Sequence, residues 1–274
     1  MLRVFVDSGS SIKQNEKDIY NVDIIPLKIN LGGKEYDDGV DIDNEIFYDF
    51  LINSKGFPKT SLPSMSFVEE KVNKYLKQGD QVLILPISSG ISGTYNSIRL
   101  LFDGNPNVRV IDTKTAVGGI RYLVEEVNKM RDKSLDEITE ALERLIPKIV
   151  VMAIPETLEY LYKGGRLSKA KYFIGSILHI NPIVGIENGS VVMFKKKHGI
   201  KGAMKYIISQ LEERNCDTNH PIIPSYTYNK SNVDDLINMT PKKYTENIKV
   251  YDDIDYAIAA HWGPNSFGYI FVSK

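Results

Sequence analysis

Hydroxyl side chains and glycines gather at the end of an apolar run near residue 88. Residues 82–87 (VLILPI) have the composition of a buried strand, and residues 88–94 (SSGISGT) lead into a helix start. The first N–H groups of a helix have no partners within the helix, so they would face the same small volume as the hydroxyls. Such a site can bind a carboxylate or a phosphate without a cationic side chain. We therefore expect an anion site centred on Ser89, with Ser92 close by.

Two further segments carry polar groups that could complete this site. Thr60 and Ser61 lie between Pro58 and Pro63, which constrain the backbone to an extended loop that presents both hydroxyls. His261 begins a His-Trp-Gly-Pro sequence between two apolar runs, and this pattern predicts a strand end at the histidine.

The same side chains allow a second chemistry. Ser89 or Ser92 with His261 would supply the nucleophile and base of a serine hydrolase or esterase. The Gly-x-Ser-x-Gly motif of one large hydrolase class is not matched, because Thr94 follows Gly93. Helix capping explains the serines equally well on local sequence alone.

The composition argues against several other classes of ligand. The 274 residues include 34 basic and 35 acidic side chains, and the net charge of −1 offers no field that would attract a nucleic acid. The chain has no phosphate-binding loop and no dinucleotide fingerprint after a strand, which disfavours nucleotides. The histidines have no metal-ligand spacing, so we expect neither a metal nor a cofactor. They are His179, His198, His220 and His261.

The sequence also predicts a compartment. A single cysteine, Cys216, excludes an internal disulfide and suits a reducing environment. The N-terminus leads straight into a strand pattern without a signal region, and no apolar run approaches membrane-spanning length. We therefore expect a cytoplasmic protein without a transmembrane segment.

The elements that must position these groups alternate in type through the first half of the chain. Strand patterns at residues 2–6, 82–87 and 108–111 each end in polar residues, and helix patterns separate them. This alternation predicts a parallel, helix-flanked sheet, in which ligands bind beyond the carboxyl ends of the strands.

Local signals indicate further boundaries. Residues 23–30 predict a strand near a sheet edge, because the segment contains a proline. Ser66 and Ser134 each begin a capping box, which predicts a helix start. The pair Asn188-Gly189 predicts a β-hairpin.

A change of pattern near residue 154 predicts a two-domain α/β protein. We expect an N-terminal domain over residues 1–154, with the parallel sheet and the anion site. The smaller C-terminal α/β domain would span residues 155–274 and contain a mixed sheet.

Six motifs make the chain similar to a known family. They lie at residues 7–10, 60–64, 87–95, 111–114, 159–168 and 261–264. In these motifs, and in their order, the sequence resembles the DegV family of bacterial fatty-acid-binding proteins. The resemblance covers nearly the whole chain. It implies two α/β lobes with a fatty acid between them, its carboxylate held by hydroxyls and its acyl chain in an apolar tunnel.

The resemblance also implies roles for individual residues. Thr60 would lie opposite Ser89 at the carboxylate, with Ser61, Ser92 and His261 as second choices. The anion site expected from the hydroxyls and the helix start agrees with these roles, because a buried carboxylate requires convergent donors. Candidate tunnel residues follow the Gly-Gly-Arg motif and show helical spacing in part. They are Phe173, Ile174, Ile177, Leu178 and Ile180.

Two basic residues, Arg166 and His198, are relevant to whether the protein has a partner. Arg166 of the Gly-Gly-Arg motif can clamp local carbonyls or contact the ligand, and we favour the structural role. Some family members serve as the acyl-binding subunit of fatty acid kinase and have an arginine at the position of His198. The resemblance therefore implies a non-enzymatic fatty-acid carrier more strongly than it implies a kinase partner. Transient contact with a membrane surface is compatible with such a carrier.

Overall fold

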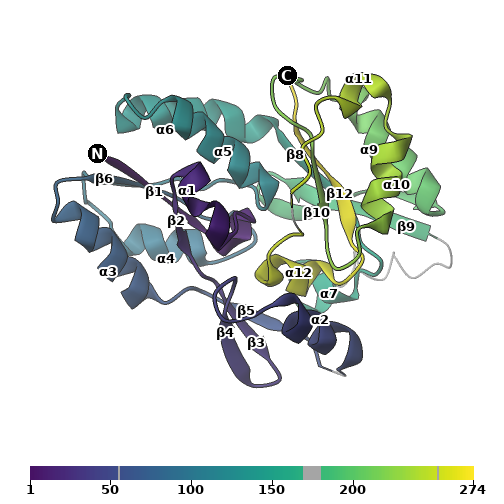
Figure 1. Cartoon of the computed structure of the whole chain (residues 1–274), viewed down its shortest axis with the longest axis horizontal. Helices are drawn as coiled ribbons and strands as arrows, with labels where there is room; N and C mark the ends of the chain where they lie inside the picture. The colour runs from purple at the N-terminus through teal and green to yellow at the C-terminus, as the bar shows by residue number, and fades with distance from the viewer. Residues whose placement is uncertain (55, 169–179, 252) are drawn as a thin grey trace.

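Two main sheets lie in different halves of the molecule (Figure 1). The computed structural model describes residues 1–54, 56–168, 180–251 and 253–274. No helix in these ranges is both long and apolar enough to cross a bilayer.

The first sheet is parallel and has the strand order β2-β1-β6-β7. Its strands are β1 (Leu2–Asp7), β2 (Asp23–Ile25), β6 (Gln81–Leu85) and β7 (Val108–Val110). The predicted parallel, helix-flanked sheet is therefore confirmed.

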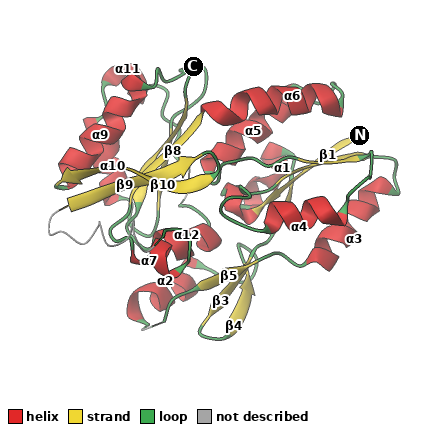
Figure 2. Ribbon diagram, turned by 180° about the vertical axis from the view of Figure 1, so that it is seen from behind, coloured by secondary structure: helices red, strands yellow, loops and turns green. Residues whose placement is uncertain are grey.

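Helices cover both faces of this sheet, with α3 and α4 on one face and α5 and α6 on the other (Figures 1 and 2). Val82 and Ile84 pack in the cluster that includes residues of α3 and α4, while Leu83 packs in the cluster of α5 and α6. This two-sided burial explains the continuous apolar run of β6. The helices are α1 (Lys17–Tyr20), α3 (Met65–Leu76), α4 (Thr94–Leu101), α5 (Gly118–Lys129) and α6 (Leu135–Leu145).

A small antiparallel sheet interrupts the first half of the chain. It contains β3 (Lys28–Leu31), β4 (Lys34–Asp37) and β5 (Lys59–Ser61), in the order β4-β3-β5. The single strand predicted over residues 23–30 is wrong. The segment breaks around Pro26, which has no N–H to donate, and its two ends join different sheets.

The second sheet has five strands in the order β10-β9-β8-β12-β11. Every neighbouring pair is antiparallel, so the predicted mixed sheet is wrong. Alternation of strands and helices does not by itself fix strand direction, and here each strand reverses the direction of its neighbour. The strands are β8 (Ile149–Ile154), β9 (Ile180–Glu187), β10 (Ser190–His198), β11 (Ile223–Tyr226) and β12 (Phe267–Val272).

Strand β8 lies at the centre of this second sheet. The expected boundary at residue 154 assigns β8 to the N-terminal domain, and β8 is a strand of the second sheet. The helices around the second sheet and the small sheet are α2 (Asn44–Asn53), α7 (Glu159–Lys163), α9 (Ile200–Glu213), α10 (Ser231–Met239), α11 (Lys242–Thr245) and α12 (Tyr256–Trp262).

Several local predictions can be compared directly with the structure. Asn188 and Gly189 form the predicted hairpin turn with φ of 50° and 79°. Ser134 begins the predicted capping box, whereas the cap of α3 lies two residues earlier than predicted, with Ser64 rather than Ser66 accepting the cap hydrogen bond. His261 lies in the last turn of α12 and not at a strand end.

Candidate functional site

A cavity of about 220 Å³ lies beyond the carboxyl end of β6 and brings four of the predicted polar residues together. Thr60 and Ser61 come from β5, Ser92 from the loop before α4, and His261 from α12. Arg166 adds a guanidinium from the loop after α7. The other lining residues are Leu27, Leu62, Ile87, Ile91, Gly93, Ala257 and Ile258.

Thr60 and His261 form a hydrogen bond of 2.7 Å between Oγ1 and Nε2. His261 is 8% exposed, and burial lowers the pKa of its imidazole to about 3, so the ring is neutral at physiological pH. Its Nδ1 is buried and has no hydrogen-bond partner among the described residues.

The lack of a partner at Nδ1 among the described residues favours one of the two tautomers of His261. A neutral imidazole carries one N–H, and placing that proton on Nδ1 would leave a buried donor unpaired. We therefore assign the proton to Nε2, which donates to Thr60 Oγ1. The hydroxyl proton of Thr60 is then free to donate to an acceptor in the cavity.

Ser92 lies at the N-terminal end of α4. Its hydroxyl is hydrogen-bonded to that of Thr94 at 2.8 Å and accepts the Thr94 N–H at 3.3 Å. Gly93 precedes the first residue of the helix and also lines the cavity. Ser92 therefore combines a hydroxyl with the positive end of a helix dipole, an arrangement that favours an anion.

Arg166 holds the loop around the cavity in place. Its Nε donates to the Ile91 carbonyl at 3.0 Å, and its Nη1 donates to the Gly164 carbonyl at 2.6 Å. Burial lowers the pKa of the guanidinium from its usual value, but arginine remains charged at neutral pH. Both contacts are to backbone, and the charge lies beside the polar end of the cavity.

Ser89 is not among the residues that line this cavity. Its hydroxyl donates to the Asp112 carboxylate, which also forms a 2.6 Å ion pair with Lys114. Burial alone would raise the pKa of Asp112, but hydrogen bonds from Lys114 and Ser89 hold it below the usual value. The structure thus brings Ser92, rather than Ser89, together with Thr60. The Asp-Thr-Lys sequence at the end of the neighbouring strand was the signal for this competing contact.

The remaining predicted residues lie elsewhere. Residues 173, 174, 177 and 178 lie outside the described residues, so the structure does not place them. Ile180 begins β9 and is half-buried, and it is not among the residues that line the cavity. His198 ends β10 and is exposed.

Two separate cavities lie at successive turns of α12. Ile258 lines the first cavity, and Trp262, one helical turn later, lines a second cavity of about 30 Å³ that is bordered by Val117 and by residues of β8 and β12. Ile87 and Val117 belong to the same buried cluster as these two side chains. Sequence reasoning did not single out Ile258 and Trp262, although their helical spacing puts both on one face of α12.

Serine hydrolase geometry is not assembled in the described part of the chain. His261 is paired with Thr60, and neither Ser89 nor Ser92 is hydrogen-bonded to it there. A nucleophile and its base must lie within hydrogen-bond reach of each other.

Asp7, at the end of β1, positions the loop that precedes the cavity. Its Oδ2 accepts the Ile87 N–H at 2.9 Å, while Oδ1 has no partner among the described residues. Burial raises the pKa of this carboxyl group to about 7. Asp7 is therefore partly protonated at neutral pH.

Asp7→Asn is expected to reduce the pH dependence of stability. The carboxyl pKa is 3.8 when exposed and about 7 when folded, so this group lowers the free energy of unfolding as pH rises through that window. Between pH 4 and pH 8 the wild type should lose on the order of 3 kcal/mol relative to the variant. Urea unfolding of both proteins across this range measures the difference. If the difference in unfolding free energy between the two proteins did not change with pH, the raised pKa of Asp7 would be contradicted.

A family comparison identifies the chain. Residues 1–274 match the family model described as an uncharacterised protein of the DegV family. The chain belongs to the DegV family. A DegV domain-containing protein of Caldanaerobacter subterraneus subsp. tengcongensis is 31% identical, over 100% of this chain and 99% of the relative. A fatty acid-binding protein of Thermotoga maritima is 29% identical to this DegV family member, over 98% and 96% of the two chains.

Solved DegV family structures have the same fold. A fatty acid binding member from Streptococcus agalactiae superposes with a TM-score of 0.90 at 26% identity, over 100% of this chain and 99% of that one. A member from Thermus thermophilus, described by its fatty acid binding, has a TM-score of 0.89 at 27% identity with the same coverage. The predicted family and the predicted α/β fold are thus confirmed.

Proposed function

We propose that this DegV family protein is a non-enzymatic carrier of one long-chain fatty acid, with the carboxylate in the hydroxyl-lined cavity. The Thr60–His261 pair carries the proposal, because with the His261 proton assigned to Nε2 the Thr60 hydroxyl proton is available to an acceptor. Ser92 and the N-terminus of α4 supply further donors. The fatty acid binding of the relatives from Thermotoga maritima and Thermus thermophilus supports this choice of anion.

The acyl chain would extend from Ile258 toward Trp262 along α12, through the apolar cluster to which both side chains belong. Each buried CH₂ group contributes about 0.8 kcal/mol, so the tail supplies more affinity than the head group. The apolar cavity beside Trp262 holds only about 30 Å³, so a tail enters only when the surrounding side chains move apart. Binding should therefore protect the residues around Trp262 from hydrogen exchange.

Organic extraction of the purified protein, followed by mass spectrometry, tests the proposal. We expect a long-chain fatty acid in about one-to-one ratio, or uptake of added fatty acid by protein that has been stripped of lipid. Protein that is isolated without lipid and takes up none would overturn the proposal.

Ser92→Ala is expected to weaken fatty acid binding about tenfold, whereas Ser89→Ala should leave it nearly unchanged. The Ser92 hydroxyl lines the cavity, and losing a hydrogen bond to a charged group costs about 1.5 kcal/mol or more. The Ser89 hydroxyl is bound to Asp112 instead. Isothermal titration of both variants with oleate provides the measurement. If both variants lost the same affinity for oleate, or if Ser89→Ala lost more, Ser89 would be part of the carboxylate site.

The polar end of the cavity is accessible, which suits presentation of the carboxylate to a fatty acid kinase catalytic subunit. Ser61, Leu62 and Gly93 are exposed at its rim. His198 stands where kinase-associated members have an arginine, so we expect slow acyl phosphate formation with a relative's catalytic subunit and ATP. His198→Arg should increase that rate. No acyl phosphate with either protein would exclude the partnership for that subunit.

A further inference from the structure

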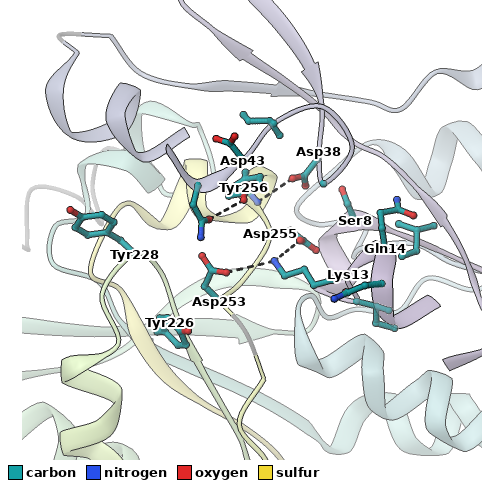
Figure 3. Close-up of a pocket in the computed structure, with 16 residues that line it drawn as sticks. Ser8, Lys13, Gln14, Asp38, Asp43, Tyr226, Tyr228, Asp253, Asp255 and Tyr256 are labelled. Carbon is teal, nitrogen blue, oxygen red and sulfur yellow. Dashed lines mark hydrogen bonds and ion pairs between the residues drawn. The ribbon is translucent and has the colours of Figure 1, made fainter. Parts of the chain in front are cut away.

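A separate cavity, of about 540 Å³, lies at the start of α12 and shares no lining residue with the hydroxyl-lined site (Figure 3). Its volume falls within the range of roughly 300–1,000 Å³ that is usual for small-molecule sites. Residues from positions 8–44 form one wall, and the other wall consists of Tyr226, Tyr228, Asp253, Asp255 and Tyr256. Nothing in the proposed fatty acid site uses this space.

The wall of this cavity carries more negative than positive charge. Among its lining residues, Lys13 is the one basic side chain and four are aspartates. Lys13 Nζ binds Asp255 at 2.7 Å and lies 3.9 Å from Asp253. The other carboxylates belong to Asp38 and Asp43.

Two of these carboxylates are deeply buried. Asp38 accepts the N–H groups of Tyr256 and Ala257 at 3.1 and 3.2 Å, in the first turn of α12. Burial raises its pKa to about 7, and burial also raises the pKa of Asp255. Lys13 and Arg121 favour the charged form of Asp255, but they offset only part of the cost of removing these two carboxyl groups from water.

Asp255 has an oxygen that the protein leaves unpaired. Its side chain is 3% exposed, and Oδ2 has no hydrogen-bond partner among the described residues. Figure 3 shows the carboxylate directed into the space among Asp38, Ser8 and Lys13. Buried polar atoms are normally paired, and because this oxygen is fully covered, a ligand donor reaches it only when the surrounding side chains move.

Aromatic side chains complete the wall. Tyr226, Tyr228 and Tyr256 line the cavity, and the Lys13 ammonium already lies 5.8 Å from the Tyr256 ring. Carboxylates next to aromatic faces favour organic ammonium groups, through ion pairing and cation–π attraction. A bare metal ion is disfavoured, because no group of three or more His, Cys, Asp or Glu side chains in the described residues could hold one.

We propose that this cavity binds a small aliphatic polyamine. One ammonium group would donate to Asp253 and Asp255, another would approach Asp43, and the alkyl chain would lie against the tyrosine rings. The excess of carboxylates selects a ligand with more than one positive charge. Because these residues do not line the hydroxyl-lined cavity, the proposal is independent of fatty acid binding.

Isothermal titration of the full chain with spermidine tests this proposal. We expect saturable one-to-one binding, and no binding of an uncharged diol of the same chain length. Asp253→Asn should weaken spermidine binding about tenfold. Its side chain is 15% exposed, so the loss of charge is compatible with folding.

Two further variants make the outcome decisive. Asp43→Asn removes a charge but retains a good N-cap for α2, so it should fold and also bind spermidine less tightly. Asp103→Asn, at an exposed position after α4, is the matched control and should bind like the wild type. Absence of saturable binding, equal losses in all three variants, or equal binding of the diol would overturn the proposal.

Discussion

Thr60→Val is expected to lower the affinity for a long-chain fatty acid by about 10- to 100-fold. Valine has nearly the shape of threonine, so the substitution removes the hydroxyl and little else. The hydroxyl is the group that accepts from His261 and donates into the cavity. Its loss removes one donor to the carboxylate and leaves the buried Nε2–H of His261 without an acceptor. The variant should therefore also be less stable, by about 1 to 3 kcal/mol.

Thr60→Ser provides the matched control. Serine retains the hydroxyl, so the hydrogen bond to His261 and the donor to the ligand both persist, and affinity should stay within a few-fold of the wild type. Titration with oleate and thermal unfolding of the three proteins measure both effects. Equal affinity of the valine variant and the wild type would show that the carboxylate does not bind at Thr60.

The sequence predicted the parallel sheet because its signals are local. Residues 82–85 are apolar without interruption, as expected for a strand covered on both faces, and the structure buries all four. Asn188-Gly189 predicted its hairpin because both residues tolerate positive φ, which the turn requires. The strand and the hairpin both depend on residues that are neighbours along the chain, so they could be predicted from the sequence alone.

The errors arose where distant residues decide the structure. His261 follows a short apolar run that fits a strand or a helix equally well, and packing within the core selects α12. Ser89 and Ser92 are only three residues apart, and both follow the same strand. Which serine lines the cavity depends on Asp112, which follows the neighbouring strand β7 and accepts the hydrogen bonds of Ser89. No pattern within residues 88–94 reports that contact.

The sequence also does not predict the contact between the parallel sheet and the second sheet. A substitution at this contact should have a large effect. The hairpin turn of the second sheet reaches the glycine-rich loop of the first, where the Ser88 hydroxyl donates to the Gly189 carbonyl at 2.7 Å. A Cβ on Gly90 would lie 2.5 Å from that carbonyl oxygen and 2.9 Å from its carbon. Backbone atoms on both sides must move to accommodate a methyl group.

Gly90→Ala is therefore expected to destabilise the protein by about 2 to 3 kcal/mol, because overpacking against backbone cannot be relieved by a rotamer change. The displaced loop also carries Ser92 and Gly93, so fatty acid affinity should fall in the same variant. Thermal unfolding and titration with oleate measure the two effects.

Gly202→Ala separates a steric effect at the lobe contact from a general response to alanine. Gly202 lies in α9, where a Cβ would have its nearest neighbour at 3.6 Å, in ordinary contact. Alanine there should stabilise the helix by about 0.5 to 1 kcal/mol and leave affinity unchanged. If Gly90→Ala instead matched the wild type in stability and affinity, the lobes would not be held together at this contact. The hydroxyl-lined cavity would then depend on the first lobe, β5 and α12 alone.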